Sequence, residues 1–246
     1  MPILKTTVNI YSKSVSVDDF RGISISSVIS KVFEHCILDI YGGFLLSGDN
    51  QFGLKKKSSC THAIYRPTLR SVVDYYVNNG STVNICALDI SKAFDKMNHH
   101  GLFLKLMQKQ IPLKLLCILE KWFKLCSTCI KWGSVVSRIF SVDCGVRQGG
   151  VLSPYLFALY IDSIVDRVRN SRTGCYLKGL CMSVLLYADD ILLIVPSVSS
   201  VNKLLHICEQ ELTVLDMAIN AKKSACVRIG SRFRHHCSTV STLDGR

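Results

Sequence analysis

Apolar residues recur along this chain at two spacings, one typical of helices and one typical of strands. The helical spacing of three to four residues occurs at 27–38, 62–76, 101–108 and after Ser200. Prolines mark two further helix starts, one at Pro112 and one at Ser153-Pro154, where Ser153 serves as the cap of a helix that runs from 155 to about 168. Short apolar runs predict strands at 83–88, 183–188, 191–195 and 225–229. Because helices and strands are interleaved irregularly, the pattern predicts an α+β fold.

Composition places the chain among globular proteins and suggests a partner. Its 246 residues are 48% hydrophobic and 20% charged, which is enough to bury a core and excludes a disordered tail. With 30 Lys+Arg against 18 Asp+Glu, the formal net charge is +12. This charge fits either a solvated basic surface or an anionic partner such as nucleic acid. No apolar run approaches the roughly 18 residues of a membrane span, and no signal sequence is evident.

The 12 cysteines do not follow a disulfide or zinc-finger pattern. Cys126 and Cys129 form one Cys-x-x-Cys, but no second pair follows at zinc-finger spacing. The other cysteines are scattered through apolar segments, where a reduced thiol behaves as a small hydrophobic group. We therefore expect buried thiols at Cys36, Cys86, Cys117, Cys181, Cys208 and Cys226.

Carboxylates stand directly against apolar runs at two places. Asp89 ends the first predicted strand, and helix capping alone would explain it. Asp189 and Asp190 separate two apolar runs, where adjacent carboxylates repel unless a cation or strong donors stabilise them. We expect a hairpin whose two-residue turn is Asp189-Asp190, with both carboxylates at its tip.

If the strand that ends at Asp89 pairs beside this hairpin, three carboxylates converge. Carboxylate oxygens suit Mg²⁺, which also accepts phosphate oxygens as ligands. Two such ions about 3.5–4 Å apart activate an attacking oxygen and stabilise a leaving one in polymerases and nucleases. Since Asp89 and Asp189 are 100 residues apart, the fold must assemble this magnesium site.

A glycine-rich loop lies between these acids, at residues 145–154. Glycines just before a helix allow a ligand to approach closely, and a helix N-terminus favours negative charge. Arg147 and Gln148 add donors suited to phosphates or bases, although an ordinary tight loop is the alternative.

Seven short motifs then occur in order between about residues 20 and 229. They are RGISI (21–25), SKVFE (30–34), QFGL (51–54), LDISKAFD (88–95), RQGGVLSP (147–154), YADD (187–190) and NAKKS (220–224). As an ordered set, they make the chain resemble the reverse transcriptase domain of LINE-type, non-LTR retrotransposons.

The resemblance implies a right-hand polymerase with fingers and palm, in which an antiparallel palm sheet packs on helices. It places the fingers, with part of the palm, at 1–82, and the palm with its catalytic carboxylates at 83–230. A turn signal at 78–81 fits this boundary. Because so few residues follow 229, we expect the thumb to be largely missing and 231–246 to be a disordered tail.

The resemblance also implies roles for single residues. It assigns Asp89, Asp189, Asp190 and the backbone carbonyl of Ile90 to two Mg²⁺ ions, with Mn²⁺ as a substitute. Lys223 would donate a proton to the leaving pyrophosphate, with neighbouring Lys222 as its competitor.

Further positions are implied for the incoming nucleotide. Phe94 would lie under its sugar and exclude a 2′-OH. Gln148 and Gly149 would contact the nucleotide and the template, and Arg21 would bind the triphosphate from the fingers.

The activity implied is extension of a DNA primer on an RNA template with deoxynucleoside triphosphates. No membrane partner is implied. The implied location is intracellular: the nucleus for action at genomic target sites, with the cytoplasm as the alternative. A catalytically inactive retrotransposon remnant that only binds nucleic acid is the competing reading, and the intact Asp89, Asp189 and Asp190 favour the enzyme. Phe94 argues against an RNA-dependent RNA polymerase.

Overall fold

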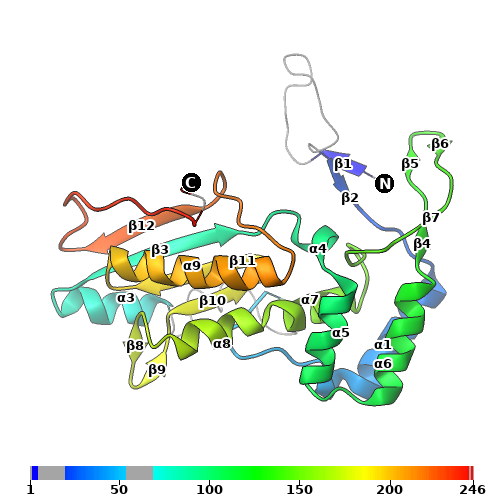
Figure 1. The fold of residues 1–246 in the computed structure, drawn as a ribbon, viewed down its shortest axis with the longest axis horizontal. Helices are drawn as coiled ribbons and strands as arrows, with labels where there is room; N and C mark the ends of the chain where they lie inside the picture. The colour runs from blue at the N-terminus through cyan, green and yellow to red at the C-terminus, as the bar shows by residue number, and fades with distance from the viewer. Residues whose placement is uncertain (1, 5–19, 54–68, 244, 246) are drawn as a thin grey trace.

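The computed structural model describes residues 2–4, 20–53, 69–243 and 245 (Figure 1). Its helices are α1 (Val28–Tyr41), the 3-10 turn η2 (Gly42–Phe44), α3 (Leu69–Asn78), α4 (Ala93–Lys96), α5 (His99–Gln108), α6 (Leu113–Lys124), α7 (Ser153–Ile161), α8 (Ser163–Asn170) and α9 (Val198–Val214). Its strands are β1 (Pro2–Leu4), β2 (Phe20–Gly22), β3 (Thr82–Asp89), β4 (Ser127–Thr128), β5 (Lys131–Trp132), β6 (Val135–Val136), β7 (Phe140–Ser141), β8 (Tyr176–Leu177), β9 (Leu180–Cys181), β10 (Val184–Tyr187), β11 (Asp190–Val195) and β12 (Ala225–Gly230).

The centre of the molecule is a four-stranded antiparallel sheet in the order β10-β11-β3-β12. Alternate residues of β3 face two different clusters, as strand geometry requires. Cys86 and Leu88 lie in the main core with α7, α8 and α9, whereas Val83 lies in a smaller core with Val72 of α3. Because helices cover both faces, β10, β11 and β3 are largely buried and read as apolar runs, whereas the residues of β12 are exposed or half-buried. The α+β prediction and its four core strands are confirmed.

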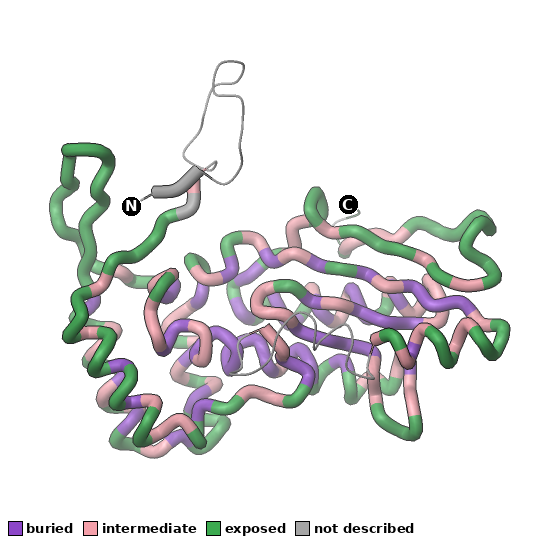
Figure 2. The backbone as a smooth tube through the Cα atoms, turned by 180° about the vertical axis from the view of Figure 1, so that it is seen from behind, coloured by how far each residue is buried: buried purple, intermediate pink, exposed green. Residues whose placement is uncertain are grey.

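Outside the sheet, α1, α5 and α6 form a helical cluster from which the β4–β7 arm extends (Figure 1). Residues 127–141 of this arm are exposed throughout, as Figure 2 shows. Near its tip, the Trp132 ring packs edge-on against Phe20 of β2, with ring centroids 4.8 Å apart. The arm was not predicted, because its two-residue strands bury no alternating apolar face.

The long helix predicted to reach about residue 168 is two helices, α7 and α8, which meet at Asp162. The Asp162 carboxylate is buried, accepts a hydrogen bond from the Gly48 N–H (3.0 Å) and pairs with Lys109. These contacts fix the segment after η2 and the C-terminal end of α5 to the junction between α7 and α8. Apolar periodicity continues across such a junction, so the sequence pattern did not reveal it.

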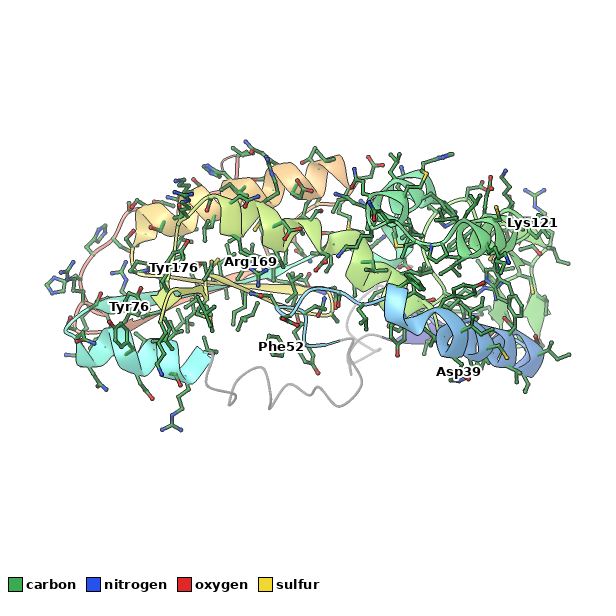
Figure 3. All side chains as sticks on the ribbon, turned by 90° about the horizontal axis from the view of Figure 1, so that it is seen from below. Asp39, Phe52, Tyr76, Lys121, Arg169 and Tyr176 are labelled. Carbon is green, nitrogen blue, oxygen red and sulfur yellow. The ribbon has the colours of Figure 1, made fainter. Side chains whose placement is uncertain are left out.

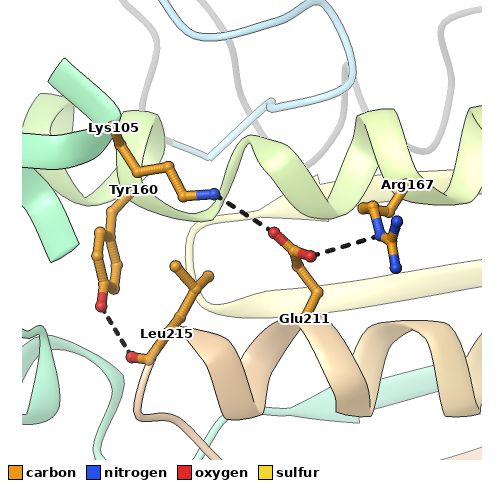
Figure 4. A network of polar contacts seen from close by, with 5 residues as sticks. All are labelled: Lys105, Tyr160, Arg167, Glu211 and Leu215. Carbon is orange, nitrogen blue, oxygen red and sulfur yellow. Dashed lines mark hydrogen bonds and ion pairs between the residues drawn. The ribbon is translucent and has the colours of Figure 1, made fainter. Parts of the chain in front are cut away.

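A buried carboxylate joins three of the helices under the sheet (Figure 4). Glu211 of α9 pairs with Lys105 of α5 (3.3 Å) and with Arg167 of α8 (3.5 Å). Nearby, the Tyr160 hydroxyl donates to the Leu215 carbonyl (2.8 Å) at the end of α9. Such a carboxylate is tolerated in the interior because cations compensate its charge.

Residues 240–243, part of the tail that we expected to be disordered, lie along α9. The Ser241 N–H donates to Asn202 Oδ1 (3.3 Å), and the Leu243 N–H donates to Glu209 Oε2 (2.7 Å). Val240 packs against the main core. The residue assignment of fingers, palm and tail stays a prediction.

The expectation of buried thiols is only partly correct. Cys86 and Cys208 are buried and Cys181 is half-buried, but Cys36, Cys117 and Cys226 are exposed, on α1, α6 and β12. Apolar neighbours in sequence do not place a cysteine on the inner face of its element. Within the described ranges, no helix is both long and apolar enough to cross a membrane.

Candidate active site

Three acidic residues meet at one end of the central sheet. Asp89 is the last residue of β3, and Asp190 is the first residue of β11 directly opposite it in the antiparallel pairing. Asp189 lies in the turn between β10 and β11. The pairing of β3 with β11 therefore brings the three residues to the same end of the sheet, as predicted.

The turn of this hairpin is one residue earlier than predicted. Tyr187 pairs with Asp190, so the two turn residues are Ala188 and Asp189, and Asp190 belongs to the strand. Ala188 has a φ of 54°, in the left-handed region that is unfavourable for residues with a side chain. A one-residue shift of this kind follows from register, which the apolar pattern alone did not define.

The electrostatics of the site are those of an acidic cluster. Partial burial raises the pKa of Asp190, and the neighbouring carboxylates Asp189 and Asp89 raise it further. Like charges held this close favour binding of a cation. In the part of the chain that is described, no three His, Cys, Asp or Glu side chains are gathered around a common point as metal ligands. The donor set of three carboxylates nevertheless has the chemistry that divalent hard cations require.

The segment before β12 positions Asp89 through its backbone. The Asn220 N–H donates to the Asp89 carbonyl (2.8 Å), and the Asp89 N–H donates to Ser224 Oγ (3.2 Å). Ser224 in turn donates to the Asn220 carbonyl (2.9 Å). In the sequence, Asn220 and Ser224 are only part of the motif at 220–224. The structure shows that they hold the end of β3.

The two lysines of this segment lie between Asn220 and Ser224, the two residues that bond to the Asp89 backbone. Lys222 and Lys223 are both exposed in the turn that precedes Ser224. Their positions do not distinguish between them, so the role given to Lys223 stays a prediction.

Phe94 lies on the short helix α4, five residues after Asp89. Its ring stacks on Phe157 of α7, with centroids 4.4 Å apart and an angle of 22° between the planes. The Phe94 carbonyl accepts a hydrogen bond from the Val146 N–H (2.8 Å). Gly145, with a φ of 79°, passes so close that an added Cβ would lie 2.7 Å from the Asp95 carbonyl oxygen. The glycine-rich loop is thus packed directly on the helix that carries Phe94.

Gln148 and Gly149 follow in the same loop. The Gln148 side chain donates to Asp95 Oδ1 (3.1 Å), and its carbonyl accepts from the Ser24 N–H (3.1 Å). Gly149 has a φ of 105°, and its added Cβ would lie 3.2 Å from the Ser24 carbonyl oxygen. The loop therefore joins the segment before α1 to the edge of the acidic site.

The N-terminus of α7, which we considered for ligand anions, is occupied by a side chain of this protein. Glu34 of α1 is buried, and its Oε2 accepts from the N–H groups of Val151 (2.6 Å) and Leu152 (2.9 Å). Ser153 is the first residue of the helix rather than its cap, and its predicted capping role is wrong. A buried carboxylate from a distant helix carries no local sequence signal.

Arg147 also contacts protein groups. Its guanidinium donates to Ser30 Oγ (3.3 Å) and Cys126 Sγ (3.2 Å) and lies 5.8 Å from the centre of the Trp122 ring. Trp122 stacks in turn on Phe33, with centroids 4.9 Å apart. A groove of about 940 Å³ between α1, α6 and the glycine-rich loop is lined by Ser30, Phe33, Trp122 and Arg147, among others.

One predicted nucleotide contact cannot be placed. The Arg21 backbone belongs to β2, but its side chain is outside the described residues. The first part of the helix predicted at 62–76 also lies outside them.

An antiparallel sheet packed on helices, with clustered carboxylates at one end, is the palm of a nucleic-acid polymerase. Comparison with solved structures supports this fold. The structure of telomerase from Candida tropicalis in complex with a TWJ fragment of telomeric RNA matches with a TM-score of 0.61 at 12% identity, covering 87% of this chain and 35% of that one. Apo telomerase of the same species, truncated from the C-terminal domain, matches with a TM-score of 0.57 at 14% identity, covering 82% and 40%.

The sequence matches the family described as reverse transcriptase (RNA-dependent DNA polymerase) over residues 5–241, and the chain belongs to that family. It is 27% identical over 184 residues to the Pol polyprotein of retrotransposable element R2 from Nasonia vitripennis, covering 71% of this chain and 17% of that protein. It is 24% identical over 248 residues to the RNA-directed DNA polymerase of the mobile element jockey from Drosophila funebris, covering 94% and 25%. These matches confirm the resemblance to retrotransposon polymerases, and the chain spans about a quarter or less of these relatives.

Proposed function

We propose that this chain is the polymerase domain that extends a DNA primer on an RNA template. The observation that carries the proposal is the pairing of Asp89 with Asp190, next to Asp189 at the hairpin turn. A sheet has little structural reason to place three carboxylates together, because each raises the energy of the others. Bound divalent cations would supply the missing positive charge, and they would also accept phosphate oxygens of the substrate as ligands.

Asp89 and Asp189 would hold two Mg²⁺ ions, with Asp190 in support and Mn²⁺ as a substitute. The Ile90 carbonyl is a further ligand in this proposal. Hydrogen bonds from the Asn220 and Ser91 N–H groups flank Ile90 (2.8 and 2.9 Å), and neither uses its carbonyl. When bound, such ions activate the attacking oxygen and stabilise the leaving one.

The chain's own side chains would orient the nucleotide. The Phe94 ring, which stacks on Phe157, would exclude a 2′-OH and so select deoxynucleotides. Gln148 and Gly149 would contact the nucleotide and template, and Arg21 would bind the triphosphate. Lys223 would give a proton to the leaving pyrophosphate, with Lys222 as the alternative donor.

The proposed partners are an RNA template, a DNA primer and deoxynucleoside triphosphates. The net charge of +12 suits a polyanionic duplex, because binding releases the counterions that surround its phosphates. The proposed location is the nucleus, where genomic target sites lie, with the cytoplasm as the alternative.

Primer extension on an RNA template with Mg²⁺ tests the proposal. Asp189→Asn removes one carboxylate with little change in shape, and we expect extension to fall at least about a hundredfold, a loss typical for a key electrostatic group. Asp39→Asn, on the exposed face of α1, is the matched control and should extend like the parent. Equal extension by parent and Asp189→Asn would refute the proposal. Duplex binding without extension by the parent would instead support the inactive remnant.

A further inference from the structure

A short segment before α3 lies along the outer edge of the catalytic hairpin. Gln51 forms a parallel bridge with Leu186 of β10. The Leu186 N–H donates to the Asn50 carbonyl (2.8 Å), and the Phe52 N–H donates to the Leu186 carbonyl (2.8 Å). Residues 50–52 thus cover the edge strand that leads to Ala188 and Asp189.

The side chain of Gln51 binds the hairpin turn itself. It is only 1% exposed. Its Oε1 accepts from the N–H groups of Ala188 and Gly53 (both 3.1 Å), and its Nε2 donates to the Ala188 carbonyl (3.3 Å). One amide side chain therefore pairs with both backbone polar groups of Ala188.

Ala188 is the residue of the turn that needs such support. Its φ of 54° is unfavourable for alanine, and backbone conformations of this kind persist only where neighbouring groups determine them. Ala188 directly precedes Asp189, so its conformation sets the direction in which the Asp189 carboxylate leaves the turn.

Gly53 completes the contact from the same segment. A Cβ added at Gly53 would lie 2.3 Å from the Ala188 nitrogen and 2.8 Å from the Tyr187 carbonyl carbon. Both atoms belong to the backbone, so no side-chain rotation could relieve the overlap. The segment fits against the turn only because residue 53 has no side chain.

The segment is in turn anchored to helix α8. Asn50 Nδ2 donates to the Val184 carbonyl (2.6 Å), and Arg169 of α8 donates to Asn50 Oδ1 (2.5 Å). Figure 3 shows Arg169 above the sheet and Phe52 below it, on opposite sides of this edge. The turn is therefore connected through Gln51 and Asn50 to a rigid element.

We propose that Gln51 is a positioning residue for catalysis, which holds Ala188 in its left-handed conformation and thereby orients Asp189. The link to catalysis rests on the polymerase function proposed above. The hydrogen bonds between Gln51 and Ala188, which we call the brace, are a property of the fold and can be tested without an activity assay.

Hydrogen exchange of the hairpin is the first measurement, on the full chain. Gln51→Met keeps the length and burial of the side chain but removes its amide, so the Ala188 N–H loses its acceptor. We expect exchange within residues 184–190 to become about tenfold faster, as loss of such hydrogen bonds allows. Gln108→Met, exposed on α5, is the matched control and should leave this peptide unchanged.

Primer-extension kinetics are the second measurement. For Gln51→Met we expect kcat to fall about tenfold or more, because small displacements of catalytic groups are costly. The KM for the nucleotide and the affinity for primer–template should stay within about threefold of the parent, as for a group that acts on the transition state. Gly53→Ala should lower kcat in the same way. Its control is Gly43→Ala, where an added Cβ meets no atom within 4 Å.

Each outcome decides one part of the inference. Unchanged exchange at 184–190 in both Gln51→Met and Gly53→Ala would overturn the brace. Faster exchange with unchanged kcat would overturn the link to catalysis. If the parent does not extend primers, the proposed function fails, and the exchange data still decide whether Gln51 holds the turn.

Discussion

Replacement of Glu34 tests whether α1 holds the glycine-rich loop in place. Glu34 is 3% exposed, and its carboxylate accepts two hydrogen bonds from the N–H groups of Val151 and Leu152, the two residues that directly precede α7. Glu34→Ala leaves both donors without a partner in a buried place. Each hydrogen bond to a charged group contributes about 1.5–3 kcal/mol. The two hydrogen bonds share one carboxylate, so their contributions do not add fully, and water can enter the space that the side chain leaves. We therefore expect the free energy of unfolding to fall by about 3 kcal/mol.

Glu34→Gln separates the charge from the hydrogen bonds. The amide oxygen can still accept from Val151 and Leu152, so only the charge is lost, including its interaction with the helix dipole. We expect a loss of about 1 kcal/mol. The order of stability should therefore be parent, Glu34→Gln, Glu34→Ala.

Urea unfolding, followed by circular dichroism, measures these differences. In a chain of this size, each kcal/mol also lowers Tm by about 2–4 °C. Glu120→Ala, an exposed residue paired with Lys124 one turn along α6, is the control and should change stability by no more than about 0.5 kcal/mol. A Glu34→Ala effect no larger than that of Glu120→Ala would refute the reasoning.

Two further predictions concern substrate and partner. Phe94→Val should increase incorporation of ribonucleotides relative to deoxynucleotides in primer extension, because it removes the ring that would exclude the 2′-OH. Phe44→Val, at an exposed position, is the control and should leave this ratio unchanged. An unchanged ratio in Phe94→Val would refute the role of Phe94 in sugar selection. Affinity for primer–template, measured by fluorescence anisotropy, should fall about 10³-fold between 50 and 200 mM salt if about six phosphates are neutralised. A flat salt dependence would show that the excess of basic residues is not the binding surface.

The sequence alone was sufficient for the parts of this protein that depend on local pattern. The four core strands were predicted because each is an apolar run of strand length between turn residues, and α1, α5 and α6 because their apolar faces repeat with helical spacing. The acids Asp89, Asp189 and Asp190 were found because charge within apolar segments is energetically unfavourable and rarely incidental.

Only the tertiary structure decided which distant groups meet. Register placed Asp190 opposite Asp89 and moved the turn to Ala188-Asp189, a difference of one residue that apolar runs do not encode. The exposed β4–β7 arm was missed because it buries no face that would leave a pattern. Gln51 and Glu34 each belong to a short sequence motif, but the motifs do not show that each side chain bonds to backbone groups more than 100 residues away. Local periodicity reports how much of an element is buried, whereas side chain-to-backbone contacts depend on how the elements pack, and packing is a property of the whole chain.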